Sequence, residues 1–345
     1  AVQMKNFDAP SSYVFIESQK KPYAVIDVTE PGFVEKANQE FQTRGCLILR
    51  GVISSRALAR IQEALRKVNE KPAMGGSVGY YMKDCAKKFY DPFLLCEEAV
   101  HAVVDERILD CMKAFTGEEM ILGETNIKQD LGINDTYFPV HSDYCLNGSW
   151  SGNPKYPTPQ AVMDKPFGIG GLVYLHDTHD GAFCYSDGTQ HWGAPYGTTP
   201  DKYPPEMQKI IDDNMIRVDG KAGDVLLFDD RGFHGPEQPT TAQRTVIIFD
   251  YTSASTFGNT IKSPAPVLVP FLTKLNQRQM KTLGLGCDIN VPYESYHTRG
   301  FYKHPYYKML AKAHKMLFGY DRLKINLRNA VKGQKKGTNA KVYKS

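Results

Sequence analysis

The sequence predicts a mainly β domain, an antiparallel sandwich or barrel that carries helices on its N-terminal side. Two observations lead to this prediction. Helix-like amphipathic segments come first along the chain, up to Gly117. From Ile121 onward the apolar residues tend to recur every second position, in short runs separated by clusters of Gly, Pro, Asn and Asp. Helices followed by many short strands are typical of a sheet core with flanking helices.

The N-terminal elements follow from local signals. Residues 45–52 form a short apolar run that predicts a buried strand. One of the two serines that follow it is expected to cap an amphipathic helix over residues 56–69. Residues 95–115 predict another helix, which should end near Gly117 because glycine commonly terminates helices.

Seven strand-like runs make up the β part. The stretch over residues 144–166, rich in Pro, Gly and Tyr, is too long for a hairpin and predicts a functional lid. The predicted strands cover residues 121–131, 137–141, 167–175, 182–186, 215–218, 224–229 and 243–251.

The strand pattern stops after Tyr251, which predicts a main domain over residues 1–251 and a largely helical extension over 252–345 packed on it. Helices are expected at residues 270–283 and about 303–331. Residues 301–345 hold twelve Lys or Arg and one acidic residue, whereas the first 300 residues carry 30 basic and 37 acidic side chains. We interpret this basic tail as a solvated helix followed by a frayed terminus, although such tails also bind nucleic acid or anionic membranes.

The composition narrows the class of protein. Seven cysteines without a CxxC pair argue against a disulfide framework and favour a reducing compartment. No stretch approaches the 18 apolar residues of a membrane span, and the start, AVQMKNFDAP, lacks the apolar run of a signal peptide. The sequence therefore predicts an intracellular, cytoplasmic protein. It does not predict an oligomeric state.

The residues that carry chemistry are His141, Asp143 and His234, followed by Arg244. His141-Ser142-Asp143 is the only His-x-Asp triplet in the chain. His141 ends one strand-like run and His234 follows another, so stiff neighbouring strands can bring them to one metal ion. Two imidazoles and one carboxylate are the ligand set of non-haem Fe(II) oxygenases, which leaves coordination positions open. Arg244 adds a cation of the kind that a dicarboxylate cosubstrate needs.

Several segments resemble the phytanoyl-CoA dioxygenase-like family of Fe(II)- and 2-oxoglutarate-dependent oxygenases. The resemblance covers roughly residues 38–251. The matching segments are residues 41–52, Leu175-His176-Asp177, 180–183, 186–191 and, most strongly, 223–228 through His234-Gly235 to Arg244.

The resemblance implies a double-stranded β-helix, also called a jelly-roll or cupin-like fold, with Fe(II), 2-oxoglutarate and O2 as cofactor and cosubstrates. It implies that His141, Asp143 and His234 bind iron and that Arg244 binds the distal carboxylate of 2-oxoglutarate. It also suggests that Asn126 and Lys128, on the preceding strand, reach the cosubstrate. Many relatives carry a hydroxyl two positions after the second histidine. Pro236 stands there in this chain, so Thr240 or Thr241 would have to replace that contact.

The resemblance implies oxidation of an unactivated C–H bond in a small-molecule substrate. Related halogenases have a small residue where this chain has Asp143, so halogenation is disfavoured. Hydroxylation is the default reaction, and desaturation or oxidative ring closure stays open, as in kainoid synthase-type cyclases of specialised metabolism. The substrate is expected to be bound by residues 71–92, 144–166 and the C-terminal extension, with Tyr80, Tyr81, Tyr144 and Trp150 as candidate lining residues.

Two alternatives belong to other classes of protein. The basic tail raises nucleic-acid or chromatin binding, but related nucleic-acid demethylases carry a second arginine where this chain has Asp250. A non-catalytic jelly-roll binding protein is the other alternative, and the intact triad argues against it. His176 and His179 form a second metal-like motif, which we interpret as a surface turn because it lacks the HExxH helix of zinc peptidases.

Overall fold

A computed structural model describes twelve segments of the chain. They are residues 20–70, 78–81, 86–89, 91–132, 139–145, 148–149, 165–178, 181–237, 243–253, 260–261, 267–284 and 288–289. The chain divides into two compact units, residues 1–291 and 292–345, and every described residue belongs to the first. The predicted boundary at Tyr251 stays a prediction, and the expected helix at 303–331 lies outside the described residues.

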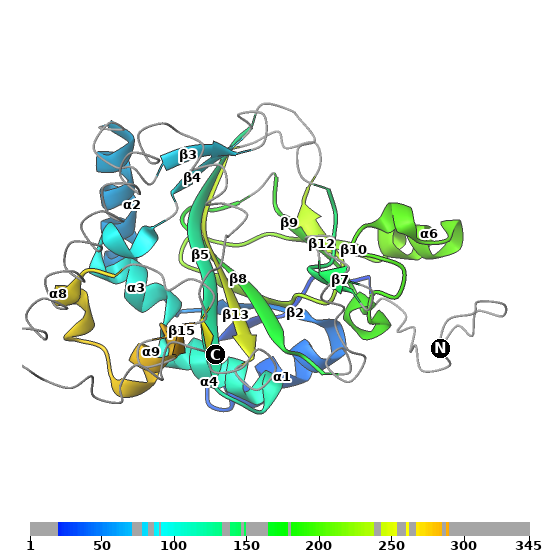
Figure 1. Ribbon diagram of the computed structural model, residues 1–345, viewed down its shortest axis with the longest axis horizontal. Helices are drawn as coiled ribbons and strands as arrows, with labels where there is room; N and C mark the ends of the chain where they lie inside the picture. The colour runs from blue at the N-terminus through cyan, green and yellow to red at the C-terminus, as the bar shows by residue number, and fades with distance from the viewer. Residues whose placement is uncertain are drawn as a thin grey trace, which may run out of the picture. The chain divides into compact units, whose positions relative to one another are not determined.

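A large eight-stranded sheet is the main element of the first unit (Figure 1). Its neighbouring strands are antiparallel, except for the parallel pair at one edge formed by the first two strands. In spatial order the strands are β1 (Val25–Asp27), β2 (Cys46–Arg50), β11 (Val225–Asp229), β8 (Gly168–Tyr174), β13 (Gln243–Ser253), β5 (Met120–Leu131), β4 (Ala86–Phe89) and β3 (Val78–Tyr81).

A smaller sheet faces the large one. It consists of β10 (Met215–Val218), β9 (Phe183–Ser186) and β12 (His234–Pro236), all antiparallel. An isolated bridge between His141 and His234 adds one more backbone pair at its edge. Two short strand pairs complete the described β structure: β6 (Tyr144–Cys145) with β7 (Gly148–Ser149), and β14 (Thr260–Ile261) with β15 (Asp288–Ile289).

The two faces of the large sheet have different partners, because side chains alternate along each strand. One face, here called the inner face, carries Leu172, Leu226, Phe228 and Val246. These residues pack with side chains of the small sheet, including Tyr185. The predicted mainly β fold is therefore confirmed, with two facing sheets and flanking helices in a jelly-roll arrangement.

The opposite face, here called the outer face, packs against the helices that precede the β part. Its apolar side chains share one core with Phe41, Ile61, Ile108 and Phe115 from these helices. Phe41 and Phe115 stack with ring centroids 4.0 Å apart, which joins the first helix to the fourth. The helices are α1 (Phe33–Arg44), α2 (Ser55–Glu70), α3 (Glu97–Val103) and α4 (Glu106–Thr116).

The helix boundaries partly confirm the predictions. The helix predicted at 56–69 is α2, and the Ser54 hydroxyl caps it by accepting the Ala57 N–H at 3.2 Å. The single helix predicted at 95–115 is wrong, because two helices occupy this stretch. Asp105 is extended (ψ 133°) and its carboxylate accepts the Arg107 N–H, so an N-cap restarts the helix as α4.

The other differences concern short elements. The helix predicted at 270–283 is two shorter helices, α8 (Val269–Leu272) and α9 (Gln277–Thr282). The strand predicted at 137–141 is described only from Pro139 and contributes the bridge at His141. Sequence reasoning also missed α6 (Pro205–Asp213). Among the described helices, none is both long enough and apolar enough to cross a bilayer.

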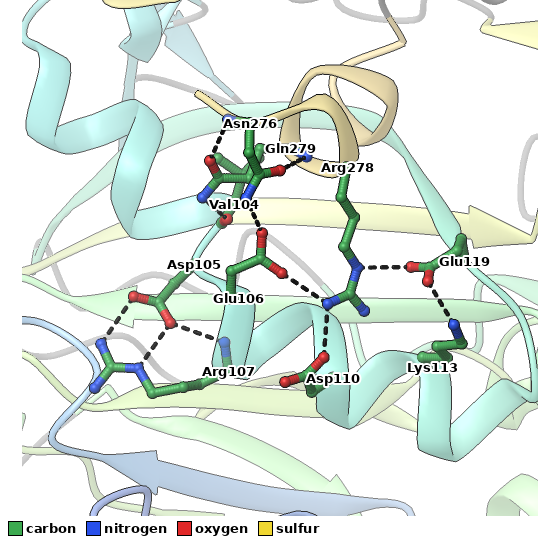
Figure 2. Close-up of polar contacts among 10 residues, drawn as sticks. All are labelled: Val104, Asp105, Glu106, Arg107, Asp110, Lys113, Glu119, Asn276, Arg278 and Gln279. Atoms are coloured by element: carbon green, nitrogen blue, oxygen red, sulfur yellow. Dashed lines mark hydrogen bonds and ion pairs between the residues drawn. The ribbon is translucent and has the colours of Figure 1, made fainter. Parts of the chain in front are cut away.

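A polar cluster attaches α9 to α4 (Figure 2). The Arg278 guanidinium donates to Glu106 and Asp110 at 2.7 and 2.6 Å and to Glu119 at 2.9 Å. The Gln279 amide donates to the Val104 carbonyl at 3.0 Å, at the end of α3. These contacts hold the segment after the last long strand against the helices beneath the outer face.

Candidate functional site

His141, Asp143 and His234 lie together because backbone hydrogen bonds fix the segments that carry them. The amide of His141 donates to the His234 carbonyl at 2.9 Å, and the amide of His234 donates back at 2.8 Å. The Asp143 amide donates to the Asp230 carbonyl at 3.0 Å. Ser142 is buried between them, and its hydroxyl donates to the Arg231 carbonyl at 2.9 Å. Two chain segments about ninety residues apart are therefore joined beside the three side chains.

The three side chains converge on one point. His141 Nε2 lies 3.3 Å from Asp143 Oδ1, and His234 Nε2 lies 3.6 Å from Asp143 Oδ2. The candidate ligand atoms are all within 4.8 Å of one another. Within the described segments, no other group of three or more His, Cys, Asp or Glu side chains meets this condition.

Both imidazoles are held in the orientation that a metal ligand needs. His141 Nδ1 lies 3.0 Å from the Pro139 carbonyl, and His234 Nδ1 lies 2.9 Å from the Gly232 carbonyl. A carbonyl can only accept, so each Nδ1 carries a proton, and each Nε2 faces the Asp143 carboxylate as the candidate ligand atom. Such hydrogen bonds behind a metal-binding histidine fix its tautomer and ring orientation.

Burial and charge favour the metal-binding protonation states of His234 and Asp143. Burial lowers the pKa of His234 to about 4, although the nearby Asp143 carboxylate opposes this shift. Burial would raise the pKa of Asp143, but the two facing histidines outweigh it and the pKa of this carboxyl is lowered overall. Neutral imidazoles and an ionised carboxylate are the forms that bind a cation. Two nitrogens and one carboxylate on one side of a common point therefore fit Fe(II).

Aromatic rings pack behind His234. The Phe228 ring on β11 lies 4.6 Å from the His234 ring, and the Phe183 ring on β9 lies 5.6 Å away. Gly170 on β8 lies next to Phe228: a Cβ atom at this position would come within 2.1 Å of the Phe228 ring. The missing side chain at Gly170 is what allows Phe228 to contact the histidine.

Arg244 is the first inner-face residue of β13, where it pairs in register with Asp130 of β5. Its side chain is buried, and Nε and Nη2 donate to Asp130 Oδ2 at 2.9 and 2.8 Å. The guanidinium fork predicted to receive a cosubstrate carboxylate therefore already engages a protein carboxylate along one edge.

Asn126 and Lys128 are also buried, and both share the inner face with Arg244 because they alternate along β5 with Ile127 of the outer core. Lys128 Nζ lies 3.2 Å from Asp130 Oδ1. The Asn126 amide donates to Glu124 at 3.2 Å, whereas its Oδ1 is buried and has no hydrogen-bond partner in the described part of the chain. A buried polar atom in this state marks a position where a ligand or a water molecule is expected.

Sequence reasoning missed two inner-face residues, Lys88 and Asp130. Lys88 pairs in register with Lys128 and is 6% exposed. Burial lowers the pKa of Lys88 to about 8; Glu124 opposes the shift and the Lys128 charge adds to it. The signal in the sequence was weak, since β4 has only four residues and its sequence, AKKF, does not alternate between apolar and polar side chains.

The other candidates predicted from the sequence, where the structure describes them, contact the protein's own backbone or side chains. His176 Nε2 accepts the Thr245 N–H at 2.7 Å, so this ring supports the start of β13. The Tyr144 ring packs edge-on against the Phe167 ring, with ring centroids 4.6 Å apart. Asp250 lies on the inner face, and burial raises the pKa of its neighbour Asp230, with the Asp250 charge raising it further. Outside the described side chains are those of Tyr80, Tyr81, Trp150, His179, Thr240 and Thr241.

Comparison with known families gives one match. A model of the family described as Phytanoyl-CoA dioxygenase (PhyH) matches residues 41–246, which is more than half of the chain. The match includes all three converging residues and Arg244. No curated protein matches the chain.

Solved structures with a similar fold include three proteins. HygX from Streptomyces hygroscopicus, bound to nickel, 2-oxoglutarate and hygromycin B, is 18% identical over 63% of this chain and 86% of its own, with a TM-score of 0.46. EctD from S. alaskensis, with 2-oxoglutarate and 5-hydroxyectoine, is 17% identical over 72% and 83%, with a TM-score of 0.48. The epimerase SnoN from nogalamycin biosynthesis is 13% identical over 65% and 84%, with a TM-score of 0.45.

Proposed function

This chain belongs to the phytanoyl-CoA dioxygenase family of Fe(II)- and 2-oxoglutarate-dependent oxygenases, and from this membership we propose that it oxidises an unactivated C–H bond of a small-molecule substrate. The iron is held by His141, Asp143 and His234. One observation carries this assignment: the three ligand atoms converge within 4.8 Å while backbone carbonyls hold both Nδ1 atoms. A ligand set on one side of the ion leaves positions for the cosubstrates.

Arg244 binds the distal carboxylate of 2-oxoglutarate, assisted by Lys128, Asn126 and Lys88. All four are buried polar residues, and their positions on β13, β5 and β4 put them on the face that also carries Phe228. Cations in a site of low dielectric bind a carboxylate more strongly than they would in water. The buried acceptor at Asn126 Oδ1 supports a ligand or an ordered water on the same face.

When bound, iron, 2-oxoglutarate and O2 supply the oxidising chemistry, with succinate and CO2 as coproducts. The chain contributes binding, orientation and exclusion of water. The Phe183 and Phe228 rings cover the protein side of His234 and keep water from that side of the ligand. Asp143 provides the carboxylate ligand that related halogenases lack, so we propose hydroxylation as the default reaction. Desaturation and oxidative ring closure are the reactions that the same site can perform on other substrates.

The assignment is tested by measuring succinate formation from 2-oxoglutarate with and without Fe(II). His141→Ala and Asp143→Ala should each abolish Fe(II)-dependent turnover while the protein stays folded. His101→Ala is a matched control, because this histidine lies on α3 and contacts Glu97 at 3.5 Å. Full activity in either ligand variant, or equal loss in the control, would show that the assignment is wrong.

Arg244→Ala separates the two parts of the site. It should raise the concentration of 2-oxoglutarate needed for half-maximal rate far more than the concentration of Fe(II), because in this proposal Arg244 binds the cosubstrate and is not an iron ligand. An unchanged dependence on 2-oxoglutarate would contradict the role proposed for Arg244.

The substrate is identified by screening. Amino-acid, acyl and terpenoid candidates should be compared for their ability to stimulate succinate release, with product masses to distinguish hydroxylation from desaturation and ring closure. An amino-acid-derived substrate that loses two hydrogens would indicate desaturation or ring closure, and a new ring without a new double bond in the product would favour the cyclase alternative.

We also propose that the reaction takes place in the cytoplasm. Cys46, Cys96, Cys111 and Cys184 are free thiols, which suits a reducing compartment. Fractionation of cells that express the native protein would test this location.

A further inference from the structure

We propose that Asp130 is a positioning residue of the cosubstrate pocket: it selects the edge of the Arg244 guanidinium that receives 2-oxoglutarate, and it keeps the Lys128 charge beside that edge. The proposal rests on the function proposed above, in which Arg244 binds the distal carboxylate. Asp130 itself lies behind the cations and does not contact the cosubstrate.

The geometry of the carboxylate supports this role. Asp130 is completely buried on β5, directly opposite Arg244 in the β5–β13 register. Oδ2 accepts from Arg244 Nε and Nη2 at 2.9 and 2.8 Å, and Oδ1 lies 3.2 Å from Lys128 Nζ. One side chain therefore joins the two cations through different oxygens.

The contact determines how Arg244 can bind a second carboxylate. A guanidinium is planar and has two edges that match a carboxylate, one made by Nε with an Nη and one made by both Nη atoms. Asp130 takes the Nε edge, so a cosubstrate carboxylate has to approach the edge made by the two Nη atoms. Without Asp130 the long arginine side chain could rotate, and ordering it again would cost binding free energy.

The contact also affects Lys128. Burial lowers the pKa of Lys128, and the Arg244 charge on β13 lowers it further, whereas Asp130 on the same strand raises it. Lys88 on β4 is the register partner of Lys128 and adds a third positive charge. The other carboxylate on this face of β5 is Glu124, which contacts Asn126 and acts on Lys88. Asp130 is therefore the carboxylate that favours the charged form of Lys128 beside Arg244.

Asp130→Asn tests the proposal, because the amide keeps the size of the side chain and removes its charge. Binding of 2-oxoglutarate to Mn(II)-loaded protein, measured by calorimetry without turnover, should weaken roughly 10- to 100-fold, as expected when a charge-assisted hydrogen bond is lost. The KM for 2-oxoglutarate should rise by a similar factor, while kcat at saturating 2-oxoglutarate and the Mn(II) affinity stay close to wild type.

A pH profile provides a readout that a purely structural role would not change. In the variant, Lys128 has lost the carboxylate that favours its charged form. The variant's dissociation constant for 2-oxoglutarate should therefore climb more steeply with rising pH than that of the wild type.

Asp187→Asn is a matched control. Asp187 is 2% exposed and pairs with buried Arg44 at 3.2 Å, away from the inner-face cations. This variant loses a buried carboxylate of the same kind and should be destabilised, but its affinity for 2-oxoglutarate should not change. Asp130→Glu keeps the charge and moves it by one methylene, so it should retain the wild-type pH dependence while binding more weakly than wild type.

The outcomes separate this proposal from the proposed function. If wild-type protein neither binds 2-oxoglutarate nor forms succinate from it, the proposed function fails. If wild type binds it and Asp130→Asn binds it equally well at every pH, the role of Asp130 is overturned. Should the asparagine variant not fold, Asp130→Glu decides, because wild-type affinity in that variant would equally overturn the proposal.

Discussion

Replacing Gly170 with alanine should weaken metal binding without touching any ligand. Gly170 lies on the inner face of β8, in register with Phe228 on β11 and with Asp250 on β13. A Cβ atom there would lie 2.1 Å from Phe228 Cζ and 2.6 Å from both neighbouring ring carbons. The backbone of Gly170 does not have a positive φ, so the cost of the substitution is steric.

The size of the effect follows from the contact distances. Ordinary contact begins at 3.4 Å, so the Phe228 ring has to move by about 1.3 Å from a Cβ at 2.1 Å. The ring lies between that Cβ and two other rings, those of Phe183 and His234, each 4.6 Å from it. Overpacking of this kind costs about 1–3 kcal/mol of stability. Displacing His234, a proposed metal ligand, through its neighbours should lower Mn(II) affinity roughly 10-fold or more.

Gly171→Ala is the control, because a Cβ atom at this neighbouring position on β8 would make an equally close contact on the outer face of the sheet. A Cβ at Gly171 would lie 2.1 Å from the Phe249 ring, in the outer-face core, and 3.0 Å from the Leu226 carbonyl. Calorimetry with Mn(II) and thermal denaturation should show both variants destabilised but only Gly170→Ala impaired in metal binding. Adding Phe228→Leu to Gly170→Ala should restore part of the stability. Equal metal affinities in the two alanine variants would refute this reasoning.

Three further predictions concern charged residues. Arg44→Met leaves the Asp187 carboxylate buried without its cation, so chemical denaturation should show a loss of about 3–5 kcal/mol. Lys88→Met should stabilise the protein at pH 7 by up to about 3 kcal/mol, because the folded-state pKa of Lys88 is lowered from 10.5 to about 8. The penalty is fully present below pH 8 and disappears as pH rises towards 10.5, so the gain measured by denaturation should vanish over that range. Arg278→Gln removes partly exposed ion pairs, each worth less than about 1 kcal/mol, and should mainly increase hydrogen exchange in α9.

The sequence predicted the long β elements because every second side chain is apolar and packs in the outer-face core, whereas the inner face carries several polar residues. The strand predicted at 243–251 is β13, and the one at 121–131 is β5, each within two residues. The break at Asp105 was not predicted. Apolar spacing continues through both α3 and α4, and only the capping aspartate indicates that the helix restarts there.

The candidate ligands could be proposed from the sequence because a His-x-Asp triplet, a later histidine and an arginine each follow or open a strand-like run. The side chains that contact these residues could not be proposed from the sequence. Asp130 and Arg244 are 114 positions apart, and their contact depends on the register between β5 and β13. A shift of one residue would put Asp130 on the outer face, so no local pattern contains this pairing.

The two faces of the large sheet explain why such charges can be buried at all. The outer face is apolar and packs on helices, so it supplies the hydrophobic stabilisation of the unit. The inner face holds Lys88, Lys128 and Arg244, whose burial is unfavourable unless anions accompany them. Asp130 compensates only part of this charge, and a bound dicarboxylate would compensate more. Stability and cosubstrate affinity are therefore opposed on this face: a substitution that relieves buried charge, such as Lys88→Met, should stabilise the protein and weaken 2-oxoglutarate binding together.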